Sequence, residues 1–210
     1  IIRNTAREHH APCREIGKNA FEIREVTRKH IAFSRTNAYH KDVIWQVPIC
    51  GIYQVKNAEI AIEAAQCLLG NKPEHEEMWR DAVAKIQWQG RMEECADHFI
   101  IDGAHNPGAI EAFVESVRAL KEEEPPILIF SAVSDKKYEQ MIEYLCRHLQ
   151  TKAFVVTEIE DKRRVPAGEL GEIFKRYATC PVYVKADVKD AIACAYEMRT
   201  KETYIYCIGS

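Results

Sequence analysis

The second half of the chain alternates between apolar segments and amphipathic segments, and this alternation constrains the fold more than any other feature. Beyond residue 88, segments with the character of strands lie at residues 98–102, 125–133, 152–157, 181–185 and 203–208. Segments with the character of helices lie between them, at about 107–121, 135–149, 166–178 and 187–199. Apolar strands that alternate with helices predict βαβ units, with right-handed crossovers and a parallel sheet covered on both faces. We therefore predict an α/β fold with a doubly wound, Rossmann-like domain over residues 88–210.

Residues 1–87 lack this alternation and are predicted to belong to a different domain. Residues 1–10 have the pattern of the end of a helix that begins upstream, and short strands are predicted at residues 13–17, 21–27, 30–34 and 42–48. A helix is predicted from Ile52 to Leu69, where Gly70 and Asn71 end it. Its predicted packing face consists of Ala58, Ala61, Ile62, Ala65, Leu68 and Leu69. A second helix is predicted at about residues 74–86.

The composition is that of an ordinary globular protein, with 47% hydrophobic residues and a net charge of -3. This charge gives no electrostatic footprint for nucleic acid or an anionic membrane. No apolar run approaches the roughly 20 residues that cross a bilayer, and the opening residues do not resemble a signal peptide. The eight cysteines form no CxxC pair, so we expect buried, reduced thiols and a cytoplasmic protein.

The segment DGAHNP, Asp102 to Pro107, is the strongest candidate for chemistry. A strand delivers Asp102 at its carboxyl end, where ligands bind in doubly wound folds. Asn106 and Pro107 suit the start of a helix, whose free N–H groups favour anions. A carboxylate there can accept both hydroxyls of a ribose, and the imidazole of His105 can donate to a phosphate or carboxylate. The structural alternative is that Asp102 caps the turn and His105 bonds the backbone.

Two neighbouring segments add candidate ligands. Arg91 is a fixed cation at the boundary between the two halves, where it could bind a phosphate or lie solvated on the surface. Gln54 and Asn57 lie three residues apart near the start of a helix and share a face. Their amides could contact an adenine edge, or they could serve only to cap and pack the helix.

Two loops are expected to complete the rim of the site. Ser134 and Asp135 are predicted to cap a helix, with Lys136 nearby, and Arg163 and Arg164 precede another helix that starts near Pro166. The sequence contains no GxxxxGK[ST] phosphate loop, no GxGxxG, no GxSxG and no HExxH. The absence of GxGxxG argues against a nicotinamide or flavin redox enzyme on this sheet.

Taken together, these segments resemble bacterial folylpolyglutamate synthases, which are often bifunctional with dihydrofolate synthase and belong to the Mur ligase superfamily. In order, PICGIYQVKNAEIAIEAAQCL resembles LLGxHQxxNAxxAxxAxxxL, WQGRMEE resembles WPGRLE, and IIDGAHNPGAIEAF resembles ILDGAHNPxAxxAL. Further along, FSAVSDKKYEQMIEYL, VVTEIEDKRRVPAGEL and IYCIGS resemble FGxxxDKDxxxML, VTExxxxRAxPAxEL and the start of VxGSLYLVGE. The resemblance extends over roughly residues 48–210. It implies that residues 1–87 are the C-terminal part of a central, ATP-binding domain and residues 88–210 the glutamate ligase domain.

The resemblance also implies a reaction and roles for individual residues. ATP phosphorylates a folate or pteroate carboxylate, and the amine of L-glutamate attacks the acyl phosphate. Asn57 and Gln54 would contact adenine, Arg91 the phosphates and Asp102 the ribose. His105 would lie near the phosphates or the glutamate and, with Arg91, would take part in catalysis. Ser210 and Arg164 would lie on the glutamate side, and the complete enzyme is expected to act as a cytoplasmic monomer in folate metabolism.

Two departures from the family pattern bear on activity. Tyr53 stands where the GxHQ segment has histidine, which puts that local contact in question. The family's phosphate loop, Mg²⁺ ligands and modified lysine are expected upstream of residue 1, so the 210 residues alone should not catalyse ligation. The alternatives are a peptidoglycan Mur ligase, which Gln54 and the DGAHNP segment disfavour, and a non-catalytic nucleotide-binding module. A phosphate loop in the complete gene product would favour the enzyme.

Overall fold

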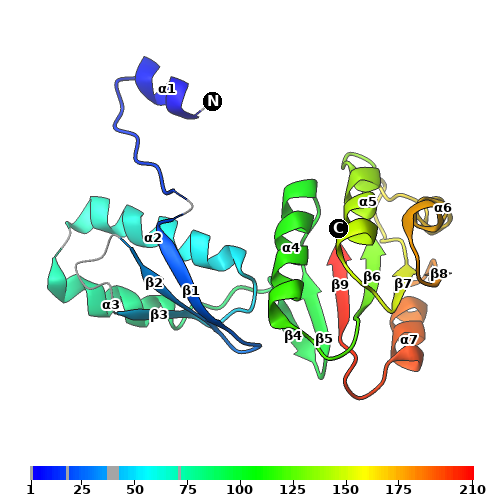
Figure 1. Ribbon diagram of the computed structural model, residues 1–210. Helices are drawn as coiled ribbons and strands as arrows, with labels where there is room; N and C mark the ends of the chain where they lie inside the picture. Colours follow the sequence, from blue (N-terminus) through cyan, green and yellow to red (C-terminus); the bar gives the residue numbers. More distant parts are fainter. Residues whose placement is uncertain (1, 18, 37–42, 71) are drawn as a thin grey trace.

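The computed structural model describes residues 2–17, 19–36, 43–70 and 72–210. Two sheets form two lobes, which Figure 1 shows side by side. The N-terminal lobe comprises strands β1–β3 with helices α2 and α3, and the C-terminal lobe comprises strands β4–β9 with helices α4–α7. Residues 1, 42 and 71, which the predicted elements include, lie outside the described residues.

The N-terminal lobe is a small antiparallel sheet covered by two helices. Its strands, in the order β1-β2-β3, are β1 (Phe21–Val26), β2 (Ile31–Arg35) and β3 (Ile44–Val47). Helices α2 (Tyr53–Leu69) and α3 (Pro73–Val83) follow, both close to their predicted ranges. Alternation of apolar residues places Ile31, Phe33, Trp45 and Val47 in the core.

Three predictions for this half need correction. Residues 13–17 form no strand, because alternation without a neighbouring strand to pair with does not stabilise extended structure. The first predicted helix is present as α1 (Ile2–Glu8), but it has no buried residue. The buried residues of α2 are Gln54, Val55, Ala58, Glu59 and Ile62, whereas Ala61, Leu68 and Leu69 are exposed. The fully buried residues of α2 therefore end at Ile62, and the half-buried Ala65 packs against the same core.

The C-terminal lobe confirms the doubly wound α/β fold. Its six-stranded sheet has the order β4-β5-β9-β6-β7-β8, in which all pairs except β4–β5 are parallel. The strands are β4 (Glu93–Ala96), β5 (Phe99–Asp102), β6 (Ile127–Ser131), β7 (Ala153–Val156), β8 (Val182–Val184) and β9 (Ile205–Gly209). The helices are α4 (Pro107–Leu120), α5 (Tyr138–His148), α6 (Ala167–Tyr177) and α7 (Val188–Met198).

Alternate residues of the parallel strands feed two separate apolar clusters. Leu128, Phe130, Phe154 and Tyr206 pack with residues of α4, α5 and α6 on one face. Ile127, Ile129, Val155 and Ile205 pack with residues of α7 on the other face. The sheet is therefore covered on both faces, as the continuous apolar character of its strands predicts.

Strand β4 was not predicted as a separate element. Its sequence, Glu-Glu-Cys-Ala, is polar and mostly exposed, and only its antiparallel pairing with β5 defines it. The expectation of buried cysteines is also only partly right. All eight are free thiols, but Cys13, Cys67 and Cys95 are exposed. Among the described residues, no helix combines the length and the apolar character needed to span a bilayer.

Arg28, in the turn between β1 and β2, joins the two lobes. Its guanidinium donates to the hydroxyl of Tyr206 at 2.9 Å and pairs with the carboxylate of Glu122. The same group lies 3.5 Å from the ring centroid of Tyr204. The side chains of Arg28 and Glu122 are 21% and 6% exposed, so this ion pair is largely buried between the lobes.

Candidate functional site

Asp102 ends strand β5 at the edge of the C-terminal lobe that faces α2. Its carboxylate oxygen Oδ2 accepts hydrogen bonds from the Tyr53 hydroxyl at 2.6 Å and from the backbone N–H of Met92 at 2.9 Å. Although Asp102 is only 4% exposed, it lines a cavity of about 260 Å³ together with Arg91 and His105. The carboxylate is thus held from behind while it faces the cavity.

Opposing effects act on the ionisation of Asp102. Burial raises the pKa of its carboxyl group above the ordinary value. The hydrogen bonds from Tyr53 and Met92 and the positive charge of Arg91 act in the other direction, because they favour the carboxylate. Burial, followed by the nearby carboxylate, likewise raises the pKa of the Tyr53 phenol. Tyr53 therefore remains a hydrogen-bond donor.

Arg91 reaches the cavity by passing over the backbone of Gly103. A Cβ atom added at Gly103 would lie 2.4 Å from Nη1 of Arg91, so this approach requires glycine. The N–H of Gly103 donates to the carbonyl of Gly90 at 2.8 Å, which fixes the two segments together. Across the described parts of the chain, Arg91 makes no hydrogen bond or ion pair, so its guanidinium is available to a ligand.

The turn from β5 into α4 has the predicted geometry. Asn106 caps the helix by accepting from the N–H of Ala109 at 3.0 Å, and Pro107 occupies the first turn. The His105 Nδ1 lies 2.7 Å from the carbonyl oxygen of Gly103. Because a carbonyl can only accept, Nδ1 carries the hydrogen. The Nε2 atom then accepts in the neutral ring and donates only in the imidazolium.

The two amides at the start of α2 have different environments. Asn57 is exposed and lines the same cavity, whereas Gln54 is 5% exposed and does not line it. Asn57 Nδ2 donates to Oε1 of Gln54 at 2.8 Å. Gln54 therefore holds the amide of Asn57, and of the two amides only that of Asn57 lines the cavity.

The predicted glutamate-side residues lie along the same sheet edge, outside this cavity. Ser210 follows β9, and its carbonyl accepts from the Ser131 hydroxyl at 2.6 Å. Gly209 has φ of 110°, and an added Cβ would lie 1.9 Å from the carbonyl oxygen of Ser131. Arg164 is exposed and donates to Glu158 at 3.1 Å. The structure thus brings together Asn57, Arg91, Asp102 and His105 but not Ser210 or Arg164.

The predicted caps of α5 are not found. The helix begins at Tyr138, and its capping position, Lys137, has no side-chain hydrogen bond. Asp135 instead pairs with Lys136 and Arg163, and the N–H of Ser134 donates to the carbonyl of Arg163 at 2.7 Å. These contacts tie the loop after β6 to the loop after β7.

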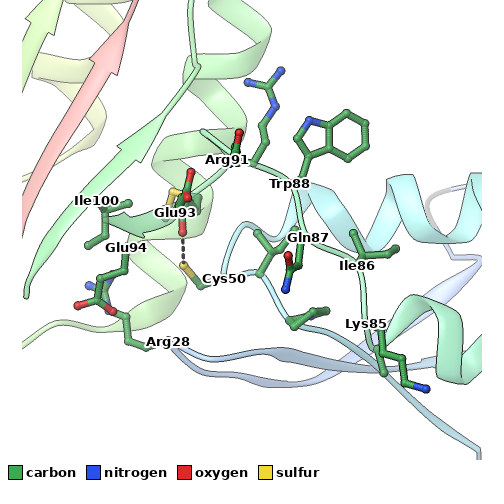
Figure 2. Close-up of a pocket in the computed structure, with 15 residues that line it drawn as sticks. Arg28, Cys50, Lys85, Ile86, Gln87, Trp88, Arg91, Glu93, Glu94 and Ile100 are labelled. Carbon is green, nitrogen blue, oxygen red and sulfur yellow. Dashed lines mark hydrogen bonds between the residues drawn. The ribbon is translucent and has the colours of Figure 1, made fainter. Parts of the chain in front are cut away.

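A larger cavity, of about 500 Å³, lies at the junction of the lobes (Figure 2). It is lined by Arg28, Cys50, Trp88 and Glu94 among others, and the Cys50 thiol donates to the carbonyl of Met92 at 3.6 Å. Burial raises the pKa of this thiol, which opposes the reactive thiolate form. Arg91 lines both cavities, and in Figure 2 its side chain extends away from Cys50 and Arg28.

Sequence reasoning missed the role of Tyr53. The only signal was that Tyr53 replaces the histidine of the similar motif, which marks the position but not the partner. Its ring packs on Gly51, where an added Cβ would lie 2.8 Å from the ring. The backbone N–H of Met92 could not be anticipated at all, because it depends on the turn of residues 90–92.

No metal site is built from the described residues. Nowhere in the described ranges do three or more His, Cys, Asp or Glu side chains lie together as possible ligands of one ion. The donor set of the cavity, a guanidinium, an imidazole, an amide and one carboxylate, suits a nucleotide better than a bare cation.

Sequence comparisons match the C-terminal lobe and part of the N-terminal one. The family described as Mur ligase, glutamate ligase domain, matches residues 90–210. A dihydrofolate synthase/folylpolyglutamate synthase of Bacillus subtilis is 28% identical over 152 residues, which are 69% of this chain and 35% of that protein. A folylpolyglutamate synthase of Lacticaseibacillus casei is 31% identical over 110 residues, or 50% of this chain and 26% of that protein. The chain spans about a third or less of these relatives.

Solved structures share the whole fold. E. coli FolC in complex with DHPP and ADP has a TM-score of 0.78 at 22% identity, over 100% of this chain and 47% of that chain. A Mycobacterium tuberculosis folylpolyglutamate synthase complexed with ADP and AMPPCP has a TM-score of 0.78 at 18% identity, over 100% of this chain and 49% of that one. Both lobes are thus arranged as in about half of each of these chains.

Proposed function

Because this chain is a folylpolyglutamate synthase-like member of the Mur ligase family and carries its glutamate ligase domain, we propose that it takes part in the ATP-dependent addition of L-glutamate to a folate. The acceptor is a tetrahydrofolate, with dihydropteroate as a further acceptor in a bifunctional enzyme. The observation that carries the proposal is the cavity in which Asp102, Arg91, His105 and Asn57 converge.

The donors and acceptors that line the cavity match the nucleoside and phosphate parts of ATP. Asn57 lies on α2 at one side and contacts the base, and the carboxylate of Asp102 accepts hydrogen bonds from ribose hydroxyls. The guanidinium of Arg91, which has no partner within the described ranges, binds phosphate oxygens. The Nε2 atom of His105, next to the N-terminus of α4, is left for a phosphate or for the glutamate carboxylate, since Nδ1 bonds the carbonyl of Gly103.

When bound, ATP supplies the phosphoryl group that converts the folate carboxylate to an acyl phosphate, with ADP as the leaving group. The amine of glutamate then attacks the acyl carbon, and phosphate leaves as the amide forms. The contribution of this chain is positioning and charge stabilisation. Ser210 and Arg164, which lie at the same sheet edge, belong to the glutamate side of the proposal. No step is assigned through Mg²⁺, because the described residues do not provide a group of ligands for it.

Residues 1–210 contain no phosphate-cradling loop of the GxxxxGK[ST] type. The proposal therefore gives these residues nucleotide binding without turnover by themselves. Formation of folate polyglutamate from ATP, glutamate and tetrahydrofolate by residues 1–210 alone would contradict this part of it. A cytoplasmic location belongs to the same proposal, as does action as a monomer.

Calorimetric titration with ADP tests the ribose assignment. Asp102→Ala should weaken ADP binding at least tenfold, because a charged hydrogen-bond acceptor is worth about 1.5–3 kcal/mol. The unsubstituted chain should prefer ADP to its 2′,3′-dideoxy analogue, and Asp102→Ala should lose this preference. Asp97→Ala, an exposed carboxylate that precedes β5 and pairs with Arg199, is the control and should bind as the unsubstituted chain does. Equal affinities for Asp102→Ala and the unsubstituted chain would show that the assignment is wrong.

A further inference from the structure

Tyr53 is the one side chain from the N-terminal lobe that bonds directly to Asp102 among the described residues. Its phenol lies behind Oδ2, the same oxygen that accepts from the N–H of Met92. The backbone N–H of Ala104 also acts on this carboxylate. The bond from Tyr53 therefore helps to fix where the carboxylate lies beside the cavity.

We propose that Tyr53 is a positioning residue, which acts through Asp102 to make nucleotide binding depend on the contact between the two lobes. The inference rests on the proposed function, because it assumes that Asp102 accepts from the ribose. Tyr53 belongs to the first turn of α2, whereas Asp102 ends β5. If the lobes separate, the carboxylate loses the phenol and the ribose acceptor loses its orientation.

The local structure is built to hold the phenol in this position. Gly51 leaves room for the Tyr53 ring, since an added Cβ would lie 2.8 and 2.9 Å from two ring atoms. The N–H groups of Gln54 and Val55 donate to the carbonyls of Gly51 and Ile52, which starts α2 in a tight turn. The backbone at Tyr53 is thus held in place. The 2.6 Å hydrogen bond from the Tyr53 hydroxyl to Asp102 is short, as expected for a bond to a carboxylate.

The phenol also affects the charge on Asp102. The other charged or titratable groups that act on this carboxylate or line its cavity are Arg91 from the linker, His105 from the β5–α4 turn and Cys50 from the segment before α2. Burial raises the pKa of Asp102, and the Tyr53 bond opposes that rise most among the favourable contacts. Loss of the phenol therefore raises the pKa of Asp102 further. Nucleotide binding that requires the carboxylate then weakens first at acidic pH.

The test measures the carboxyl group and the ligand separately. In the 210-residue chain, the pKa of Asp102 is followed by carbon NMR of labelled aspartate, and ADP affinity is measured from pH 5 to 8. Tyr53→Phe should raise the pKa of Asp102 and weaken ADP binding about tenfold, with the greatest loss at the acidic end. The control is Tyr138→Phe, whose phenol donates to Glu169 at 2.9 Å on the exposed surface and should change neither quantity.

Each outcome decides between the two proposals. An unchanged pKa of Asp102 in Tyr53→Phe overturns the positioning role, as does unchanged ADP affinity with an unchanged pH profile. If the unsubstituted chain does not bind ADP at any pH, the proposed function is contradicted. In that case the pKa of Asp102, compared between the unsubstituted chain and Tyr53→Phe, still shows whether the Tyr53 hydroxyl stabilises the Asp102 carboxylate. A uniform loss of ADP affinity without a change in pH profile indicates a merely structural role and also overturns the proposal.

Discussion

The hydroxyl of Tyr53 donates to Oδ2 of Asp102 at 2.6 Å, and this contact connects two elements 49 residues apart in the chain. One belongs to the small antiparallel lobe and the other to the doubly wound lobe. The candidate nucleotide site is therefore assembled at the junction of two sheets. Substitutions at this junction show how side-chain volume, charge and the contact between the lobes each affect ADP affinity and stability.

Gly103→Ala should remove Arg91 from the cavity. The added methyl group would lie 2.4 Å from Nη1, and the guanidinium is the far end of a flexible side chain, so it moves aside at little cost in stability. We expect ADP affinity to fall about tenfold, as in Arg91→Ala, because a charge-assisted bond is worth about 1.5–3 kcal/mol. Calorimetric titration measures the affinity, and thermal unfolding measures the stability.

The matched control is Gly168→Ala. Gly168 lies in α6, where an added Cβ meets nothing within 4 Å. This substitution should raise stability by about 0.5–1 kcal/mol and leave ADP affinity unchanged. If Gly103→Ala retains the affinity of the unsubstituted chain, Arg91 does not contact the nucleotide.

Asp102→Asn should stabilise the fold at neutral pH while it weakens nucleotide binding. Burial raises the pKa of Asp102, so the folded state prefers the protonated carboxyl group. Ionisation of Asp102 destabilises the fold increasingly as the pH rises from the ordinary carboxyl pKa of 3.8 through the raised pKa of the folded state. The increase in the free energy of unfolding caused by Asp102→Asn should therefore be absent at pH 3 and complete at pH 7. Urea unfolding at both pH values measures this free energy. An equal increase at the two pH values would contradict the raised pKa.

Much of this fold could be predicted because it follows from local patterns. The parallel strands β5 to β9 are continuously apolar, and the helices between them repeat with a helical period, so their order and type follow from the sequence. Strand β4 could not be predicted in this way, because its residues are polar and only its pairing with β5 at the edge of the sheet makes it a strand. Residues 13–17 show the opposite error, because they alternate like a strand but pair with none.

The residues of the candidate site also differ in how far the sequence predicts them. Asp102, His105 and Asn106 could be placed from the sequence, because a strand, a turn and a helix start fix them within six residues. The contact of Tyr53 with Asp102 could not, since it depends on how the two lobes pack. A sequence shows which residue departs from a motif, but a phenol and a carboxylate 49 residues apart meet only in the folded chain.

Arg28→Met should loosen the junction of the lobes. It leaves the carboxylate of Glu122 buried without its cation, which typically costs about 3–5 kcal/mol. Denaturant unfolding should show a loss of this size. The double variant Arg28→Met/Glu122→Leu should recover part of it, because no uncompensated charge remains.

Arg147→Met is the control, on α5. The pair of Arg147 with Glu143 is exposed, at 64% and 37% of the side chains, and such pairs contribute about 0–1 kcal/mol. Equal losses for Arg28→Met and Arg147→Met would mean that the buried pair does not hold the lobes together.

Gly209→Ala should destabilise the carboxyl end of the central strand. An added Cβ would lie 1.9 Å from the backbone oxygen of Ser131, and neither backbone can move without disturbing β6. We expect a loss of about 3 kcal/mol or more from overpacking and backbone strain together. Gly70→Ala separates the two effects. Gly70 also has positive φ but open space around it, so it should lose only about 1–2 kcal/mol. Similar losses at both positions would exclude a collision at Gly209.

Strand β9 lies between β5 and β6, although it is the last of the six strands to leave the ribosome. Until residues 205–209 have been synthesised, β5 and β6 have no shared neighbour, and the middle of the sheet stays open. Tyr206, which Arg28 contacts, is also absent until then. Nascent chains should therefore expose the unpaired edges of β5 and β6 until β9 has been made, which makes this lobe dependent on protection from aggregation during that interval.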